Sequence, residues 1–217
     1  MLEVRNLKCV RGGRTLFEDL SFTLAPGAWL HLRGANGAGK TSLLRILCGL
    51  AQPAAGSVAW RGAVVGGARG GDRSGDGSGD RYAFRAESFY LGHLLALNDV
   101  LSVAENLRFC CALAGNACDD AALRRALATV GLRGLERRLV RNLSWGQRRR
   151  VALARLVLTG ARLWILDEPF VALDAAALAM LDDLIAGHLT AGGMAVVTSH
   201  QDVRIGRHAP QVLELAA

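Results

Sequence analysis

Apolar and polar residues alternate near the start of the chain. Leu2 and Val4 alternate with polar neighbours, and Leu20, Phe22 and Leu24 repeat the pattern shortly before a Pro-Gly turn. A period of two places alternate side chains on the same face of a strand. The N-terminal segment is therefore predicted to form strands with one buried face.

Later apolar runs are continuous. Residues 163–166 read LWIL and residues 194–198 read MAVVT, which is typical of strands buried on both faces of a parallel sheet. Between them, leucines and Ile185 recur at helical spacing after Asp174, a residue suited to start a helix. This strand, helix, strand order indicates an α/β fold.

The middle of the chain has a different pattern. Residues 119–130 begin with two acidic residues, carry leucines at helical spacing and stop at Gly131, so an amphipathic helix is predicted there. Residues from about 98 to 158 are interpreted as a helical subdomain inserted in a single domain of residues 1–217. Residues 66–81, GGARGGDRSGDGSGDR, contain no large apolar side chain and are predicted to form a flexible surface loop.

Composition and charge limit the function classes. No apolar run reaches the roughly 18 residues of a membrane-spanning helix, and the N-terminus lacks the pattern of a signal peptide, so a cytosolic chain is expected. The five cysteines include no C-x-x-C pair, which argues against a disulfide framework, a zinc site or covalent haem attachment. The net charge of +7 suits nucleic acid, anionic lipid or a phosphate ligand and does not choose among them.

A glycine-rich segment lies between a predicted strand and a predicted helix. Residues 34–42 read GANGAGKTS and match the pattern G-x-x-x-x-G-K-S/T in the context that this pattern requires. Glycines let backbone N–H groups face phosphate oxygens, and the positive end of the following helix faces the same anion. Lys40 is one of only two lysines in the chain, and its compact charge suits the terminal phosphates. The predicted phosphate site comprises Gly34, Ala35, Asn36, Gly37, Ala38, Gly39, Lys40, Thr41 and Ser42.

Two adjacent carboxylates follow the predicted strand at 163–166. Asp167 is expected to hold Mg²⁺ together with Thr41, and Glu168 to polarise a water for in-line attack on a phosphate. Ligands bind at the carboxyl ends of strands in open α/β sheets. His200 follows the other continuous apolar strand and is interpreted as a contact to the terminal phosphate.

Residues 143–147, LSWGQ, predict a helix that begins at an anion site. Ser144 and Gln147 have the spacing of a capping box. Gly146 costs the helix about 1 kcal/mol relative to alanine, and the usual compensation is that backbone can approach a ligand closely. The residues alone do not identify that ligand.

Taken in order, these motifs resemble those of ABC transporter nucleotide-binding subunits, over essentially the whole chain. The resemblance implies a P-loop NTPase (RecA-like) α/β core with a parallel sheet, an N-terminal antiparallel β subdomain and a helical subdomain. It makes residues 34–42 the Walker A loop, and Asp167 and Glu168 the Walker B pair. It also makes Asp174, in VALD, a nucleotide-binding residue of the D-loop, and His200 the switch histidine.

The resemblance also implies ligands and a partner. In this family two domains face each other head to tail around ATP and Mg²⁺, and the signature helix of one caps the γ-phosphate held by the other. A second copy of the chain is therefore expected as partner, with Ser144, Gly146 and Gln147 contacting ATP across the interface.

Three positions depart from the family pattern. Leu94 follows LGH where many members carry a glutamine that reaches Mg²⁺. Arg11 stands near where many carry an aromatic ring that stacks on adenine, and its guanidinium would have to stack instead. Trp145 replaces a small residue of the signature motif.

A closer resemblance is to the haem-exporter ATPases of cytochrome c maturation. It rests on RTLFEDLSF, RGANGAGKTSLLRILCGL and RRRVALARLVLTGARLWILDEPFVALD. This resemblance implies integral membrane transporter subunits as partners, a peripheral position on the cytoplasmic face of the bacterial inner membrane, and release of haem to a haem chaperone. No haem site is predicted in the chain itself.

Alternatives remain open at this point. One is the ATPase of another exporter with a different cargo. A second is an ATP-gated scaffold with little turnover, suggested by Leu94, Arg11 and Trp145. A third is a DNA or RNA machine, suggested by the charge, but such relatives usually carry two cassettes or a long coiled-coil insertion. Neither is present, so no nucleic-acid partner is expected.

Overall fold

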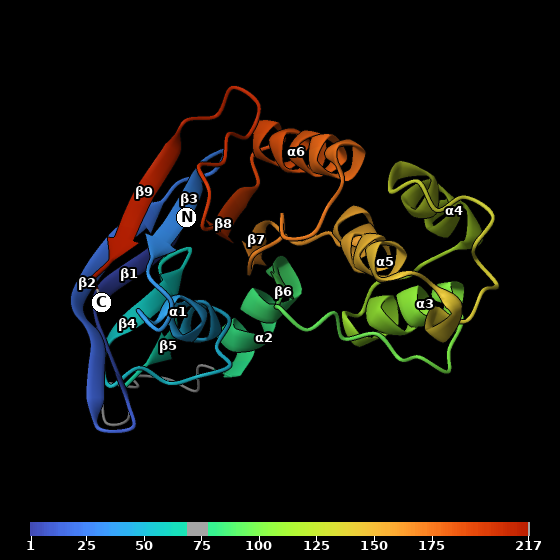
Figure 1. Ribbon diagram of the computed structural model, residues 1–217. Coiled ribbons are helices and arrows are strands. Elements are labelled where there is room, and N and C mark those ends of the chain that lie inside the picture. Colours follow the sequence, from blue (N-terminus) through green and yellow to red (C-terminus); the bar gives the residue numbers. More distant parts are fainter. Residues whose placement is uncertain (69–77, 217) are drawn as a thin grey trace.

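The computed structural model describes residues 1–68 and 78–216, whose strands form two sheets (Figure 1). The strands are β1 (Leu2–Arg11), β2 (Arg14–Leu24), β3 (Trp29–Gly34), β4 (Ala55–Trp60), β5 (Ala63–Gly67), β6 (Ser88–Leu91), β7 (Leu163–Leu166), β8 (Met194–Thr198) and β9 (Pro210–Leu215). The helices are α1 (Lys40–Leu47), α2 (Ser78–Glu87), α3 (Val103–Leu113), α4 (Asp120–Thr129), α5 (Trp145–Leu158) and α6 (Ala175–Thr190), with a short 3-10 helix at Val140–Asn142.

The N-terminal strands belong to a four-stranded antiparallel sheet of order β2-β1-β4-β5. Leu2 pairs with Leu24, and Val4 pairs with Phe22. All four of these side chains are buried, because the period of two turns them to the same face of the sheet. The strands predicted from the alternating pattern are therefore confirmed.

The second sheet is parallel and has five strands in the order β6-β7-β8-β3-β9. Every residue of β7 and β8 is buried, as the continuous apolar runs predicted. Successive residues of β7 pack on opposite faces: Leu163 lies in a core with α1 and the antiparallel sheet, and Trp164 lies in a core with α5 and α6. The parallel sheet is thus the middle layer of the fold.

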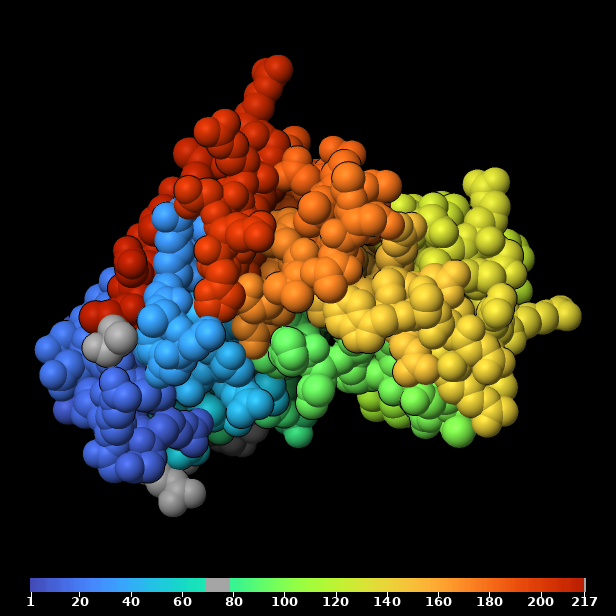
Figure 2. All heavy atoms as spheres, in the orientation of Figure 1, coloured from blue at the N-terminus to red at the C-terminus, as the bar shows by residue number. Residues whose placement is uncertain are grey.

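The helices α3, α4 and α5 pack on one another beside the sheets and form a lobe of their own (Figures 1 and 2). The helix predicted at 119–130 is α4, with Asp119 as its N-cap and Gly131 after its end at φ 70°. No helix within the described ranges is both long and apolar enough to cross a membrane.

The segment predicted as a loop at 66–81 is shorter in the structure. Gly66 and Gly67 pair through their backbones with β4, and residues 78–81 form the start of α2. This helix is anchored by Phe84, which is buried against Trp60. The prediction was wrong at both ends because glycine can extend a strand without a side chain, and the anchor of α2 lies beyond the polar run. Residues 69–77 of the predicted loop lie outside the described residues.

Candidate active site

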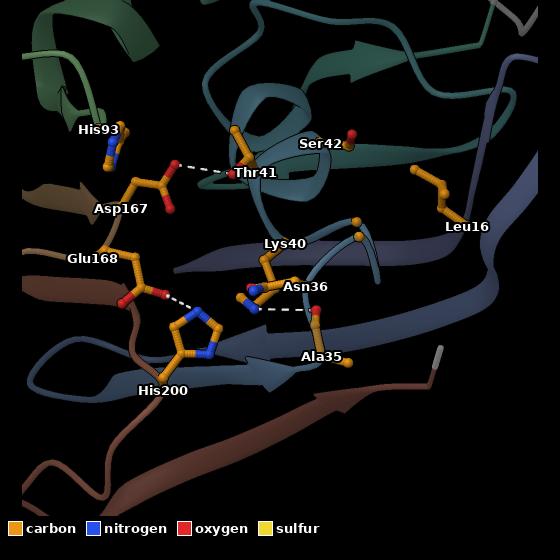
Figure 3. A pocket seen from close by; sticks show the side chains of 12 residues that line it. Leu16, Ala35, Asn36, Lys40, Thr41, Ser42, His93, Asp167, Glu168 and His200 are labelled. Carbon is orange, nitrogen blue, oxygen red and sulfur yellow. Dashed lines mark hydrogen bonds and ion pairs between the residues drawn. The ribbon is translucent and has the colours of Figure 1, made fainter.

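A pocket of about 400 Å³ lies at the carboxyl edge of the parallel sheet (Figure 3). Four neighbouring strands open onto it: the glycine loop follows β3, His93 follows β6, Asp167 and Glu168 follow β7, and His200 follows β8. This is the edge at which parallel α/β sheets bind ligands. The lining residues are Leu16, Ala35, Asn36, Gly37, Gly39, Lys40, Thr41, Ser42, His93, Asp167, Glu168 and His200.

The glycine loop leads directly into α1. Gly39 is the N-cap of α1 at φ 103°, and no side chain caps this helix start. A Cβ atom at Gly39 would lie 3.1 Å from Cβ of Leu16 and 3.2 Å from Cδ1 of Phe17, so both the conformation and the space require glycine. The uncapped start of α1 points its backbone N–H groups and its positive end at the pocket, as an anion site requires.

Lys40 holds its charge beside this loop. The residue is largely buried, and its Nζ donates to the carbonyl oxygens of Gly34 at 2.7 Å and Ala35 at 3.2 Å. The ammonium is therefore positioned by the same loop whose backbone frames the pocket (Figure 3).

Asp167 is held by two hydroxyl groups. Thr41 Oγ1 donates to its Oδ2 at 3.1 Å, and Thr198 Oγ1 donates to its Oδ1 at 2.9 Å. Asp167 is only 4% exposed. The carboxylate is thus fixed beside the first turn of α1, and together with the Thr41 hydroxyl it presents the oxygen ligands that Mg²⁺ prefers.

Glu168 has an unusual backbone. Its φ is 49°, a conformation that is uncommon for a residue with a side chain. Its N–H donates to Thr198 Oγ1 at 2.7 Å, and its carbonyl oxygen accepts from Arg149 Nη2 at 2.6 Å. Burial lowers the pKa of the Arg149 guanidinium, and the charges of Asp167 and Glu168 oppose that shift.

The carboxylate of Glu168 faces His200 across the pocket. Glu168 Oε1 lies 3.3 Å from Nε2 of His200, an ion pair only when the imidazole is protonated. Within the described residues this oxygen has no hydrogen-bond partner. The Glu168 side chain as a whole is partly exposed and lines the pocket, so its carboxylate can take a proton from a water molecule there, which is the requirement for a general base.

The helix start at Ser144 lies outside this pocket. Ser144 Oγ accepts from the N–H of Gln147 at 3.2 Å, and Gln147 Oε1 accepts from the N–H of Ser144 at 3.0 Å, so the predicted capping box is confirmed. A Cβ at Gly146 would meet no atom within 4 Å, and the side chain of Trp145 is exposed. The structure does not bring Ser144, Gly146 or Gln147 to the pocket of their own chain.

Asp174 also lies outside the pocket. Its carboxylate caps α6 by accepting from the N–H of Ala177 at 2.8 Å, and it forms an ion pair with Arg150 of α5. Asp174 is therefore tied to the same helix that begins at Ser144.

Two of the positions that depart from the family pattern lie outside this pocket. Leu94 is 83% exposed and does not line the pocket, whereas its neighbour His93 does. Arg11 does not line it either, and the apolar contact beside the glycine loop comes from Leu16. The position of His93 after β6 is a signal that sequence reasoning missed, because the carboxyl-end rule applied to Asp167 also applies there. Leu16 had no such signal.

Comparison with known proteins places this geometry in context. The model of the ABC transporter family matches residues 17–171. The cytochrome c biogenesis ATP-binding export protein CcmA of Albidiferax ferrireducens is 50% identical over 216 residues, covering 100% of this chain and 97% of the relative. The protein of the same name from Aromatoleum aromaticum is 49% identical and covers 100% of this chain and 95% of the relative.

Solved structures share the fold. A putative ABC transporter ATP-binding protein from Pyrococcus furiosus has a TM-score of 0.80 at 23% identity, with 99% of this chain and 96% of that chain covered. An ATP-binding cassette solved as a dimer bound to ADP and Pi has a TM-score of 0.78 at 20% identity, with 99% and 94% covered. The fold is that of a P-loop NTPase.

Proposed function

Because this chain belongs to the ABC transporter family, we propose that it is the ATP-hydrolysing subunit of a complex that exports or releases haem during cytochrome c maturation. The observation that carries the ATPase assignment is the convergence of Lys40, Thr41, Asp167, Glu168 and His200 in one pocket. The haem assignment is supported by full-length relatives named as cytochrome c biogenesis export proteins. An exporter of the same class with a different cargo is the alternative.

The chemistry follows from the pocket. The backbone of residues 34–42 and the start of α1 bind the phosphates of ATP, and Lys40 turns its ammonium to the terminal ones. Glu168 orients a water and takes its proton as that water attacks the γ-phosphate in line. His200, 3.3 Å from the Glu168 carboxylate, contacts the γ-phosphate and the base together.

Asp167 and Thr41 are the residues that would hold Mg²⁺. Their oxygen atoms lie 3.1 Å apart, and both are hard ligands of the kind this ion selects. When bound, the ion neutralises charge on the phosphate oxygens. His93, which lines the same pocket, is available to contact a water of that site.

A second copy of the chain completes the site. The start of α5 is ordered by its capping box, but it does not line the pocket of the same chain. The residues concerned are Ser144, Gly146 and Gln147. No described residue outside its own helix turn crowds Gly146, which leaves its backbone open to a phosphate held by another subunit. ATP then lies between the glycine loop of one subunit and the α5 start of its twin, and hydrolysis reopens the pair.

Membrane subunits are the further partners. Phe109 and Leu113, one turn apart on α3, are 58% and 74% exposed, and Leu94 is also exposed. Apolar side chains at a surface indicate a binding partner when they are grouped. We assign the surface of α3 that carries Phe109 and Leu113 to integral membrane transporter subunits. Binding to these subunits holds the chain peripherally on the cytoplasmic face of the inner membrane, and the complex passes haem to a chaperone.

The Glu168→Gln variant tests the ATPase assignment. It is expected to bind ATP normally, to lose about 10²- to 10⁴-fold in hydrolysis and to accumulate as closed dimers, measured by phosphate release and by size-exclusion chromatography. Glu18→Gln, which removes an exposed carboxylate paired with Lys8, is the control and should leave hydrolysis unchanged. Normal turnover by Glu168→Gln would reject this residue as the base.

One observation favours a second candidate, an ATP-gated scaffold with little turnover. The exposed ring of Trp145 stands at the α5 start, where it can hold the two subunits in an unproductive arrangement. Steady hydrolysis by the chain reconstituted with its membrane partners would exclude the scaffold. The absorption spectrum of that purified complex would show whether haem is the cargo.

A further inference from the structure

One residue outside the pocket contacts the main chain of Glu168. Arg149 lies on α5, is 3% exposed, and donates from Nη2 to the Glu168 carbonyl oxygen at 2.6 Å. The N–H of Glu168 donates to Thr198 Oγ1 at 2.7 Å. Glu168 is thus held from both sides, by β8 through Thr198 and by α5 through Arg149.

The conformation of Glu168 explains why such a hold is needed. A side-chain-bearing residue at φ 49° is strained, and strain of this kind persists only where the surroundings impose it. These two short hydrogen bonds fix the peptide groups on either side of the strained Cα, and the only other hydrogen bond to the Glu168 carbonyl oxygen within the described residues is a longer one, from the Val171 N–H at 3.4 Å. Their loss would let the backbone relax and turn the carboxylate from the position it takes beside His200.

Burying the Arg149 side chain is unfavourable for the stability of the fold, so a purely structural role does not explain it well. A buried guanidinium loses its hydration, and within the described residues its Nε has no hydrogen-bond partner. A buried charge with unused donors is unfavourable for stability, and an apolar side chain of similar volume commonly serves a core better. The two neighbouring arginines differ, because Arg148 and Arg150 reach outward to Asp99 and Asp174.

We propose that Arg149 is a positioning residue for Glu168: it keeps the left-handed backbone of Glu168, and hence its carboxylate, in the orientation needed for hydrolysis. Since Arg149 is on the helix that begins at Ser144, any displacement of that helix start by the second subunit reaches Glu168 through one hydrogen bond. This inference rests on the proposed ATPase function. It adds a residue that does not contact ATP.

The test compares Arg149 with a buried arginine of the same helix. Arg155 is 9% exposed and also donates to a main-chain oxygen, that of Leu95, so Arg155→Met removes a similar contact at a distance from the pocket. We expect Arg149→Met to lower kcat about tenfold to hundredfold, in line with misplacement of a catalytic group, while KM and ATP affinity stay unchanged. Arg149→Lys, which keeps a donor, should recover part of kcat. Arg155→Met should leave kcat unchanged.

A double-mutant cycle separates positioning from general damage. If Arg149 acts through Glu168, Arg149→Met causes no further loss in a Glu168→Gln background. An equal fold-loss in both backgrounds, a fall in ATP affinity as large as the fall in kcat, or a kcat loss matched by Arg155→Met would overturn the proposal. If Arg149→Met fails to fold, the same cycle with Arg149→Lys decides. Absence of hydrolysis by the unchanged chain would instead reject the ATPase function itself.

Discussion

Two helix starts in this chain are predicted from their motifs to bind phosphate, and they are built in opposite ways. The start of α1 follows Gly39, has no side-chain cap and opens into the pocket. The start of α5 follows Ser144 and is capped from both directions, by the Ser144 hydroxyl and the Gln147 amide. The first leaves its free N–H groups to a ligand, whereas the second has already satisfied two backbone donors within the chain.

The glycines of the two starts show the same contrast. A Cβ at Gly39 would lie 3.1 Å from Leu16, whereas a Cβ at Gly146 would meet nothing within 4 Å. The fold of its own chain therefore requires glycine at position 39, whereas no contact among the described residues requires glycine at position 146. A helix residue that lowers helix stability without an internal reason points to another molecule. This contrast supports the proposal that the α1 site is complete in one subunit and that the α5 site needs a second.

The largest expected effect comes from removing the charge at the α1 start. Lys40→Ala should weaken ATP binding about tenfold to hundredfold, because a hydrogen bond to a charged group contributes about 1.5–3 kcal/mol, and it should abolish turnover. Binding of a fluorescent ATP analogue measures the first effect. Lys8→Ala is the matched control, since Lys8 is the other lysine of the chain and its ion pair with Glu18 is exposed. Equal binding by both variants would contradict an α1 site that is complete in one subunit.

A substitution at the α5 start should change hydrolysis but not ATP binding. Ser144→Arg is expected to stop hydrolysis while the monomer still binds ATP, because the bulk and charge block only the approach of a second subunit. Phosphate release and binding are measured on the same preparation. Ser102→Arg is the control, since Ser102 starts α3 with the same capping box through Glu105 and loses the same cap. Loss of ATP binding in Ser144→Arg alone would mean that α5 serves its own subunit, and the contrast between the two starts would fail.

Much of this fold could be predicted from local patterns, because burial leaves a regular period in the sequence. The strands β7 and β8 and the capping box at Ser144 are examples, each determined by neighbours in the chain. Contacts between residues far apart in the sequence could not be predicted in this way. Arg149 stands in a run of three arginines that suggests a solvated surface, and only the packing of α5 against the strand end at Glu168 turns it inward.

The same limit applies to the pocket. The sequence located three of the four strand ends that form it, before the glycine loop, Asp167 and His200, but did not predict β6. Without that strand the sequence could not show that His93 lines the pocket and Leu94 does not. Leu16 lies on β2 of the antiparallel sheet, whereas the glycine loop follows β3 of the parallel sheet, so the two come into contact only in the folded chain. Register and tertiary packing decide such contacts, and neither leaves a local period.

The smallest and most specific effect separates folding from function at Gly146. Gly146→Ala adds one methyl group to a helix with open space around it, so its free energy of unfolding should stay equal or rise by up to about 1 kcal/mol. Gly187→Ala is the control, since Gly187 lies within α6 and also has nothing within 4 Å of a Cβ. Both variants should fold equally well in thermal unfolding experiments. Only Gly146→Ala should lose turnover, about tenfold, because its methyl group occupies the space that the twin's ATP must enter. Unchanged turnover in Gly146→Ala would mean that no ligand approaches this helix start, and α5 would then be an ordinary capped helix.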